Sequence, residues 1–473
     1  MRDSLKMDIF SQILDQANNI LWTYVLVAML ISCAIWFTLR CKGVQLTMLR
    51  DIPTLFRNCT HERQEEYAER ISSFQAFAIS IASRVGTGNL AGVAVAIAMG
   101  GPGAVFWMWL IAFLGAGSAF VESTLAQLFK IKGEDSFIGG PAYYMSIGLK
   151  KPWMGAIFSV LLIFTFGFAF NSVQSNTICQ AFEEAYDISP SYMGTVLTLI
   201  TVAIIFGGIQ SIARVSSIIV PFMALGYIAL ALTIIAMNIT EIPAVLQLIF
   251  SHAFGWEQGL AGGVGAAIQQ GIRRGLYSNE AGMGSAPNVA ATADVSHPVK
   301  QGKVQAISVF SDTLIICSCT AFIILASGVD YTGKVNGIKL TQMALCQQIG
   351  SWGNSVVAIA IFFFAYSSVL GNYYYGEANI RFLSQKTWVL TAYRFVVAAM
   401  VLFGAVANLH LVWNLADFFM GLMTICNLIA IVLLGKYAFR LLEDYRAQKR
   451  QGITNPSFSK EKMPDIANDL QCW

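Results

Sequence analysis

The stretch Ser83-Arg84-Val85-Gly86-Thr87-Gly88-Asn89-Leu90-Ala91-Gly92 decides how the rest of the chain is interpreted. Apolar residues lead into it from Phe74 and out of it to Ala98, as in a membrane helix. Its glycines remove the Cβ atom and loosen the helix at mid-length. Unpaired backbone groups at membrane depth are tolerated only where protein or a polar cavity satisfies them, so the stretch predicts a ligand site at a broken helix. Close packing of small residues between helices is the alternative interpretation.

The composition is that of a polytopic membrane protein. Of 473 residues, 56% are hydrophobic and 12% are charged, whereas a soluble globular protein carries about 25% charged residues. The four histidines lie in or near predicted loops, and the nine cysteines form no CxxC pattern. The N-terminus is too polar for a signal peptide, so the first apolar run is expected to remain in the protein.

Apolar runs long enough to cross a membrane predict eleven spans, because a span needs about 20 mostly apolar residues. They cover residues 20–39, 71–99, 104–129, 153–180, 191–209, 215–237, 259–284, 304–327, 354–380, 388–407 and 411–434.

The distribution of lysine and arginine predicts the orientation of the chain. The segment 40–70 and the residues after 435 are rich in both, and alternation assigns Arg273 and Arg274 to the same side. The opposite side holds few basic residues. Since basic residues collect in cytoplasmic loops, we expect the N-terminus outside and the C-terminus in the cytoplasm.

Ten of the eleven spans divide into two sets of five, at residues 71–238 and 239–435. Residues 1–70 add one N-terminal span and a cytoplasmic loop, and residues 436–473 form a cytoplasmic tail. An odd number of spans gives the halves opposite orientations, the inverted-repeat plan of secondary transporters. Glycines at 262–271 predict a second break, which matches the first.

Polar residues at comparable depth on several spans predict a shared cavity. They are Asn89, Gln174, the pair Gln269 and Gln270, and the pair Ser367 and Ser368. Half-helix N-termini suit a carboxylate, while unwound carbonyls and hydroxyls suit a small cation. Phe170 is expected to line the cavity. Alternatively, the serines bond their own helix and the amides bridge neighbouring helices.

Ionisable residues within spans are functional hypotheses by default. Asp312 and Glu122 are the deepest acids. Arg84, one turn before the glycines, is expected to pair with an acid and close the inner side. The sequence does not identify the partner, and Glu280 and Glu377 are candidates in addition to Asp312 and Glu122.

Three peripheral segments carry weaker predictions. Segment 40–70 is either a helix on the inner membrane surface or an ordinary loop. Residues 245–250 are too short to span and are expected to lie across the outer face. The tail is expected to begin as a charged helix at 441–446 and then to be polar and mobile.

Four motifs together resemble the alanine or glycine:cation symporter family of prokaryotes, over residues 15–440. The first is the opening stretch, at 83–93. The others are Gly139-Gly140-Pro141-Ala142-Tyr143-Tyr144-Met145, the segment Asn279-Glu280-Ala281-Gly282-Met283-Gly284-Ser285-Ala286-Pro287, and the segment 366–377.

The resemblance implies an all-α LeuT-type fold of five plus five helices preceded by one extra helix. It implies sodium-coupled, sometimes proton-coupled, uptake of alanine or glycine across a bacterial inner membrane, with no cofactor beyond the coupling ion. Sodium would contact the backbone at Ala82 and Val85 and the hydroxyls of Ser367 and Ser368.

The same resemblance assigns the other site residues. The substrate carboxylate would lie at Gly86, Thr87, Gly88 and Asn89. Gln174 and either Gln269 or Gln270 would approach the amino group or close the pocket. The segment 279–287, with Asn279 and Glu280, would follow the second broken helix on the inner side and act as a gate or a coupling loop.

The sequence leaves three alternative functions. A carrier of the same fold for another substrate, driven by protons, is the nearest alternative. An intramembrane enzyme lacks a histidine at membrane depth or any paired catalytic set in the sequence. A passive channel fits poorly with two broken helices and no ring of repeated charges.

Overall fold

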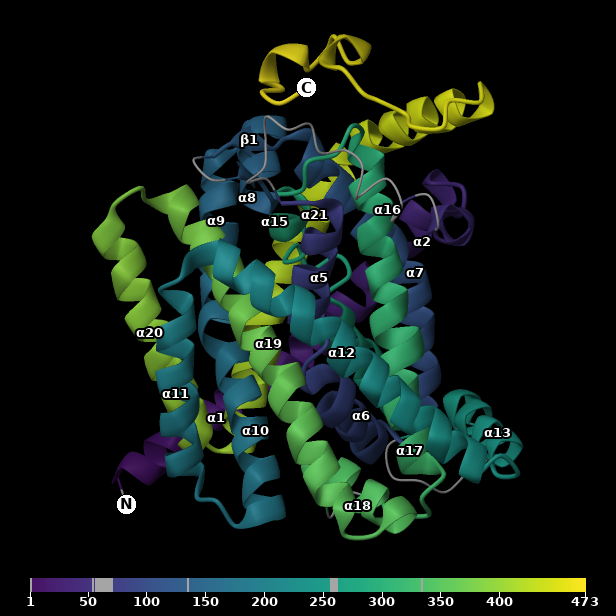
Figure 1. Cartoon of the computed structure of the whole chain (residues 1–473), viewed down its shortest axis with the longest axis vertical. Helices are drawn as coiled ribbons and strands as arrows, with labels where there is room; N and C mark the ends of the chain where they lie inside the picture. Colours follow the sequence, from purple (N-terminus) through teal and green to yellow (C-terminus); the bar gives the residue numbers. More distant parts are fainter. Residues whose placement is uncertain (1, 53–54, 56–70, 134–135, 256–262, 333–334) are drawn as a thin grey trace.

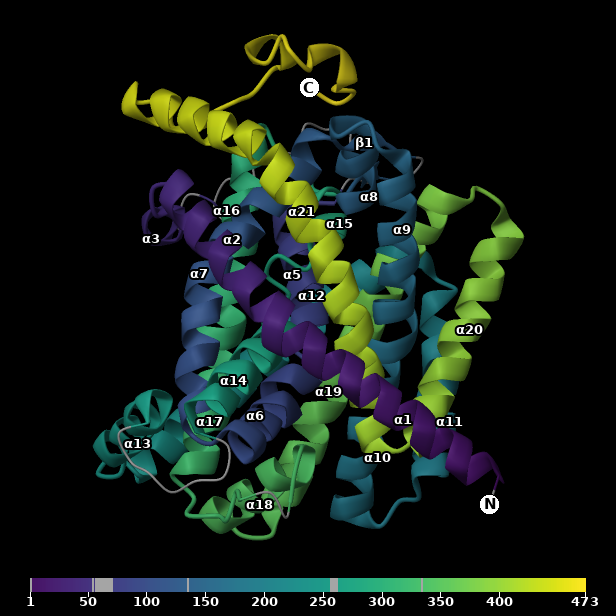
Figure 2. The same ribbon diagram turned by 180° about the vertical axis from the view of Figure 1, so that it is seen from behind.

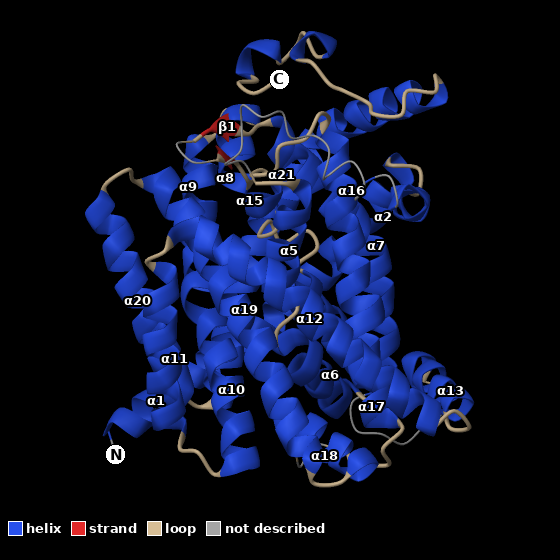
Figure 3. Cartoon of the chain, in the orientation of Figure 1, coloured by secondary structure: helices blue, strands red, loops and turns tan. Residues whose placement is uncertain are grey.

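The computed structural model describes residues 2–52, 55, 71–133, 136–255, 263–332 and 335–473. This part of the chain is almost entirely helical (Figure 3). The strands β1 (Ile131–Lys132) and β2 (Phe137–Ile138) form one short antiparallel pair. The two ends of the chain lie at opposite ends of the molecule (Figure 1).

Two faces of the molecule are named here for what covers them. The lid face carries α13 (Ile242–Phe254) and α18 (Ile338–Ile349), and the tail face carries the strand pair, α8 (Pro141–Tyr143) and the end of the chain (Figure 1).

Long helices connect the two faces. In chain order they are α1 (Arg2–Ile20) with η1 (Leu21–Leu26) and α2 (Val27–Arg40), α5 (Ser73–Arg84) with η4 (Gly88–Gly92) and α6 (Val93–Gly100), α7 (Gly103–Leu128), α9 (Pro152–Leu162) with η6 (Ile163–Phe170) and α10 (Asn171–Tyr186), α11 (Pro190–Ile205), α12 (Gly208–Met237), α14 (Gly263–Asn279), α16 (Pro298–Val309) with η7 (Phe310–Cys317) and α17 (Ser318–Leu325), α19 (Trp352–Leu383), α20 (Thr387–Val406) and α21 (Leu409–Arg450). Shorter helical turns are α3 (Val44–Thr47), η2 (Met48–Asp51), η5 (Tyr144–Gly148), α15 (Pro287–Ala290), η8 (Lys460–Lys462) and η9 (Ala467–Asp469).

Seven helices of the described chain are long and apolar enough to cross a membrane, or nine if each of two bent pairs is one span. The predicted range 191–209 coincides with α11, which has only 16 residues. The predicted range 259–284 contains α14, a helix of 17 residues. Each of the eleven predicted ranges therefore contains a helix, although α11 and α14 are short for a span.

The first predicted break is present. A capping box at Ser72 and Gln75 begins α5, which ends at Arg84. The chain leaves helical geometry at Val85 and Gly86 and resumes in η4, so α5 and the helix that follows are bent by 48°. The break lies in the middle of the span, between α5 and α6, as the glycines predicted.

The second break lies elsewhere than predicted. The described glycines between 263 and 271 are part of the continuous helix α14, and Gly262 lies outside the described residues. A Cβ at Gly271 would lie 2.6 Å from Cβ of Trp107, so this glycine permits close helix packing. The helix ends at Asn279, and Glu280, Gly282 and Gly284 take positive φ angles that a helix cannot continue. The unwound segment is 280–286.

The peripheral segments have mixed outcomes. Residues 245–250 lie in α13, which is bent by 103° from the preceding half of α12 and lies across the lid face. Within the segment 40–70, for which a surface helix was one prediction, the described part contains the short turns α3 and η2, while residues 53–54 and 56–70 lie outside the described residues. The prediction of a mobile tail is wrong, because Met463 and Leu470 are buried and the tail runs across the tail face.

Specific bonds hold the tail in place. The Phe458 N–H donates to the Ser296 carbonyl at 2.9 Å, and the Trp473 indole donates to the Gln127 carbonyl at 3.0 Å. The Trp473 ring also lies against Phe458, with ring centroids 5.5 Å apart. The tail thereby joins α21 to α7 and to the loop before α16.

Candidate functional site

The broken helix is held by two side-chain amides. Asn89 Oδ1 accepts from the Gly86 N–H at 2.9 Å, and Gln174 Oε1 accepts from the Thr87 N–H at 3.0 Å. These two backbone donors lie at the point where the chain leaves helical geometry. The amide oxygens occupy the positions from which a carboxylate oxygen would accept the same N–H groups. The structure therefore brings Gln174 from α10 to the glycine break.

The two glycines of the break lie in close contact with other helices. A Cβ at Gly86 would overlap the Ser368 hydroxyl, and a Cβ at Gly88 would lie 2.9 Å from the Ser278 Cα. Both substitutions would force a neighbouring helix to move. Packing therefore accounts for the glycines as well, and it places α19 and α14 directly against the break.

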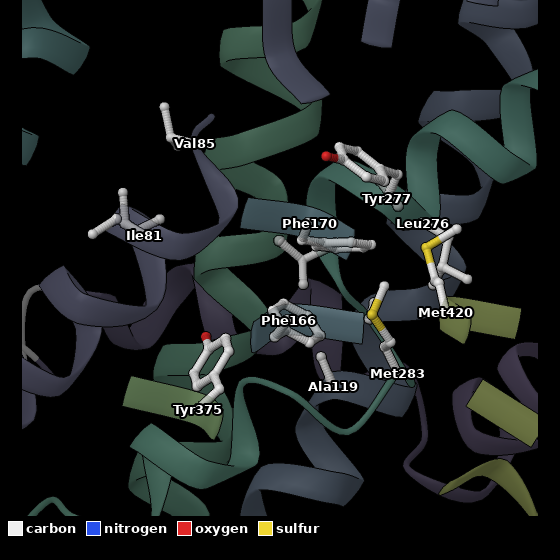
Figure 4. Packing of buried hydrophobic residues seen from close by; sticks show 14 of the residues in the cluster. Ile81, Val85, Ala119, Phe166, Phe170, Leu276, Tyr277, Met283, Tyr375 and Met420 are labelled. Atoms are coloured by element: carbon white, nitrogen blue, oxygen red, sulfur yellow. The ribbon is translucent and has the colours of Figure 1, made fainter. Parts of the chain in front are cut away.

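Aromatic rings cover the break on its lid-face side. The Phe170 and Tyr277 centroids are 4.5 Å apart, and those of Tyr277 and Trp413 are 4.8 Å apart. The Tyr277 hydroxyl lies 3.1 Å from Thr87 Oγ1. Figure 4 shows Phe170 of η6 lying between Tyr277 of α14 and Phe166 of η6. These rings limit the room beside Thr87.

Hydroxyls and carbonyls converge where the sequence resemblance implied a sodium site. Ser368 Oγ lies 3.0 Å from the Ala82 carbonyl and 3.5 Å from that of Val85. Ser367 Oγ lies 3.3 Å from the same Ala82 carbonyl. Both serines also bond the Phe364 carbonyl of their own helix, so the alternative interpretation applies as well. Neutral oxygens at this spacing suit a hard cation such as Na⁺.

Asp312 joins the break to α14 and η7. Its carboxylate accepts from Asn89 Nδ2 at 2.7 Å, from Ser278 Oγ at 2.8 Å and from Thr313 Oγ1 at 2.9 Å. The side chain is fully buried. The sequence identified Asp312 only by its depth, and its contact with Asn89 depends on how three helices pack.

Arg84 does not form the predicted ion pair in the described structure. Its guanidinium donates to the Gln305 carbonyl at 3.2 Å and to the Ser308 hydroxyl, both on α16. Glu377 instead pairs with Arg381 at 2.8 Å, one turn further along α19. An i,i+4 partner on the same helix is always within reach, whereas Arg84 is on another element.

The predicted gate residues Asn279 and Glu280 hold the second break. Asn279 Nδ2 donates to Thr313 Oγ1 at 3.2 Å, while its Oδ1 accepts from the Ala281 N–H at 3.0 Å. Glu280 accepts from Ser83 Oγ at 3.0 Å and from Ser285 Oγ at 2.6 Å. Glu280 therefore connects the unwound segment 280–286 to the last turn of α5.

Glu122 of α7 holds the same unwound segment. It accepts from the Gly282 N–H at 3.1 Å and from Asn427 Nδ2 at 2.8 Å. Asn427 also donates to the Gly282 carbonyl at 2.9 Å. Both backbone groups of Gly282 are thereby satisfied by side chains at a place where a helix would otherwise satisfy them.

Gln269 and Gln270 do not reach the first break. Gln269 Nε2 donates to Thr23 Oγ1 of the N-terminal helix at 2.9 Å. Gln270 lies against Gly100 at the lid-face end of α6, since a Cβ there would lie 3.0 Å from the Gln270 Cβ. The substrate role predicted for this pair depended on a break at 262–271, and the described residues of that segment, 263–271, are helical.

Sequence reasoning missed one charged cluster. Arg273 and Arg274 were assigned to the cytoplasmic side, yet both are largely buried on α14 and pair with Asp417 of α21 at 2.5 Å. The Arg274 guanidinium also lies over the Trp413 ring at 4.5 Å. Two adjacent arginines inside a predicted span were the available signal, because membrane-embedded charges require a partner.

Comparisons with known proteins agree on one family. The family model described as "Sodium:alanine symporter family" matches residues 7–460. The "probable sodium/glutamine symporter GlnT" of Bacillus subtilis is 50% identical, over 98% of this chain and 96% of the relative. The "amino-acid carrier protein AlsT" of the same organism is 48% identical over 98% of each chain.

A solved structure shares the fold at low sequence identity. MhsT, crystallised in complex with L-phenylalanine, matches with a TM-score of 0.54 and 14% identity, over 86% of this chain and 93% of that one. This likeness concerns the fold alone, and it confirms the LeuT-type architecture predicted for the helices.

Proposed function

The chain belongs to the sodium:alanine symporter family, and we propose that it takes up alanine and glycine together with sodium, from the lid face to the tail face. Its class is a multi-pass membrane symporter coupling amino acids to sodium, and it is not an enzyme. The bacterial inner membrane is the proposed location, with the tail face in the cytoplasm. Even without Arg273 and Arg274, the tail face has many more lysines and arginines than the lid face, as expected of a cytoplasmic side.

The observation that carries the proposal is the pair of backbone donors at the first break. Gly86 and Thr87 present N–H groups that the side-chain oxygens of Asn89 and Gln174 satisfy. A substrate carboxylate would replace those acceptors without needing a buried cationic side chain. The amides so released would turn to the substrate, and Gln174 is the one placed to meet the ammonium group.

The proposed sodium site explains coupling by contact. Ser368 touches the carbonyls of Ala82 and Val85, and a Cβ on Gly86 would meet the same hydroxyl. An ion held there would fix the end of α5 directly before the amides that hold the substrate. Linkage then requires that sodium and substrate each raise the affinity for the other by the same factor.

Asp312 is proposed to orient the site without touching substrate. Its bond to Asn89 Nδ2 points Asn89 Oδ1 at the Gly86 N–H. Its negative charge also adds to the attraction of this region for a cation. An unpaired carboxylate at this depth is costly, and three hydrogen bonds reduce that cost.

Closure on the tail-face side is proposed to involve Arg84, Asn279 and Glu280. Arg84 joins α5 to α16, and Glu280 joins the unwound segment to Ser83. Both contacts begin at the last turn of α5, so movement of α5 would break them together. That movement would open a route from the break to the tail face.

Glutamine is a second candidate substrate, because a 50% identical relative is named a probable sodium/glutamine symporter. The rings of Phe170, Tyr277 and Trp413 favour the smaller amino acids. A glutamine side chain would require these rings to separate.

The test is uptake into proteoliposomes that contain the purified chain. Labelled alanine, glycine and glutamine are supplied with an inward sodium gradient, with potassium replacing sodium, and with a proton gradient alone. Accumulation of alanine or glycine only with sodium supports the proposal. Accumulation of glutamine alone would establish the second candidate, and accumulation driven by protons alone would overturn sodium coupling.

A further inference from the structure

The N-terminal helix lies outside the two sets of five helices. It nevertheless contacts the charged cluster of Arg273, Arg274 and Asp417 on the lid-face side of the break. It runs diagonally across the back of the molecule over α21 (Figure 2). Trp22 in η1 is fully buried, and its indole donates to the Asp417 carbonyl at 3.2 Å. Asn18, one turn earlier, donates to the Asn414 carbonyl at 2.9 Å.

The N-terminal helix and α21 approach each other closely. A Cβ at Gly421 of α21 would lie 2.8 Å from Cδ1 of Leu26, and Leu21 is nearer still. The contact occurs where the N-terminal helix adopts its π-helical turn. Such turns reposition side chains within a helix and are frequent at functional sites.

The same helix also contacts the arginine side of the cluster. The Arg273 guanidinium lies 5.5 Å from the Trp22 ring centroid, within cation–π distance. Gln269, one turn before Arg273 on α14, donates to Thr23 Oγ1 at 2.9 Å. Trp22 and Thr23 therefore touch both helices that the ion pairs join.

The cluster lies directly between the lid face and the break. Arg274 covers Trp413, Trp413 packs on Tyr277, and Tyr277 contacts Thr87. Two guanidinium groups share one Asp417 oxygen in a buried place, so the cluster carries a net positive charge. Buried ion pairs depend on good geometry, because desolvation offsets much of their attraction. A small shift of Asp417 would therefore favour the separated, hydrated state.

We propose that the N-terminal helix is a working part of the lid-face gate, and that Trp22 is a positioning residue that holds Asp417 and Arg273 in the closed arrangement. This rests on the proposed function, in which substrate reaches the break from the lid face. Loss of the indole N–H leaves the Asp417 backbone less constrained, and the lid-face-open state gains population.

The direct test compares Trp22→Phe with Trp36→Phe in proteoliposomes. Phenylalanine keeps a ring beneath Arg273 but cannot donate to Asp417. Trp36 is on the same helix and 47% exposed, so its substitution is the matched control. We expect Trp22→Phe to lower both kcat and the half-saturating sodium concentration by about fivefold, because one hydrogen bond changes a population by about that factor. A residue that is merely structural would reduce the amount of folded transporter and leave the half-saturating sodium concentration unchanged.

A second variant tests the proposal if Trp22→Phe does not insert properly into the membrane. Thr23 is exposed, so Thr23→Ala should fold, and it removes the contact with Gln269. It should shift both constants in the same direction by about twofold. Equality of Thr23→Ala and Trp36→Phe in both constants would overturn the proposal.

Amide hydrogen exchange separates this inference from the proposed function, because it needs no substrate. Trp22→Phe should raise exchange in residues 413–421 and 269–277 relative to Trp36→Phe. If the wild type transports none of the three amino acids, the substrate proposal fails while the exchange result still decides the role of Trp22. Raised exchange confined to residues 11–40 would overturn that role.

Discussion

The two sides of the glycine break are closed by different chemistry. On the lid-face side, Arg273 and Arg274 meet Asp417 beside the tilted, contacting rings of Trp413 and Tyr277. On the tail-face side, Glu280 and Glu122 hold an unwound backbone through neutral donors. The charged side chains of an ion pair can move apart and become hydrated while their helices stay intact. An unwound segment, by contrast, must rearrange its backbone to open. The comparison indicates that the two sides open by different movements, which the following variants test.

The largest effect is expected at the point that both sides share. Gly86→Ala would push its Cβ into the Ser368 hydroxyl and displace α19 from α5. Overpacking of this kind costs about 1–3 kcal/mol, and here it also deforms both proposed binding sites. We expect loss of sodium-driven uptake, measured in proteoliposomes. Gly226→Ala is the control, since a Cβ there meets nothing within 4 Å; equal activity of the two variants would contradict this site assignment.

Asp417→Asn tests the lid-face side alone. Breaking a buried pair leaves two guanidinium groups uncompensated and costs about 3–5 kcal/mol. Uptake should fall at least 50-fold, and thermal unfolding should occur at lower temperature. Asp465→Asn removes an exposed pair with Arg440 that is worth about 0–1 kcal/mol, so it should leave both measurements nearly unchanged. A mild Asp417→Asn variant would show that the ion pairs do not hold the gate.

Replacing Ser367 and Ser368 together by alanine should act on sodium more than on substrate choice. The half-saturating sodium concentration should rise about tenfold, the effect of losing about 1.4 kcal/mol of ion binding. The ratio of alanine to glycine uptake should stay within twofold. Ser311→Ala is the control, because Ser311 Oγ donates to its own helix at Ile307. Unchanged sodium activation in the double variant would remove the serines from the ion site.

Trp473→Ala should release the tail with a smaller effect on transport. The indole bond to the Gln127 carbonyl and the packing on Phe458 would both be lost. We expect faster protease cleavage after residue 450, with uptake altered by less than about threefold, as for the loss of a single bond of about 0.5 kcal/mol. Ile453→Ala, which replaces an exposed side chain, is the comparison. Equal cleavage of both variants would show that Trp473 does not hold the tail.

The smallest effect is expected from a change of pH at His297, whose ring contacts Phe458 of the tail with ring centroids 5.8 Å apart. Burial lowers the pKa of His297, and the nearby Lys462 and Lys300 act in the same direction, against the hydrogen bond to Asp444. An unperturbed histidine has a pKa of about 6.5. Because the pKa of His297 is lower than this when the tail is packed, the packed state disfavours the protonated ring. The contact is therefore stable above about pH 6.5 and weakens as pH falls towards the lowered pKa. Protease cleavage of the tail should rise between pH 7.5 and 5.5, and His297→Gln should abolish that rise.

Local sequence was informative where backbone chemistry alone determines structure. Gly86 and Gly88 with Asn89 predicted the first break, since glycine both weakens a helix and permits close approach. The same reasoning failed for the glycines at 263–271, because α14 is continuous there: Gly271 packs the helix against α7, while a Cβ at Gly263 or Gly265 would meet nothing of the described chain within 4 Å. A glycine that ends a helix and a glycine that packs it look alike in sequence. The actual second break was already contained in the motif that begins at Asn279.

Charged residues were harder to place. Alternation of the predicted spans put Arg273 and Arg274 on the cytoplasmic side, because nothing in the sequence pairs them with Asp417, more than 140 positions away. Arg84 likewise bonds a carbonyl and a hydroxyl of α16 rather than a predicted acid. A partner for a buried charge depends on which helices become neighbours.

The sequence by itself determined that this is a membrane protein with a broken helix and a polar site at that break, because apolar length, glycine and amide chemistry are local properties. Tertiary structure decided what meets at the break. It brings Gln174 and Asp312 to the glycines, takes Gln269 and Gln270 away from them, and places Trp22 against Asp417. These contacts join residues tens to hundreds of positions apart, and only helix packing specifies such distances.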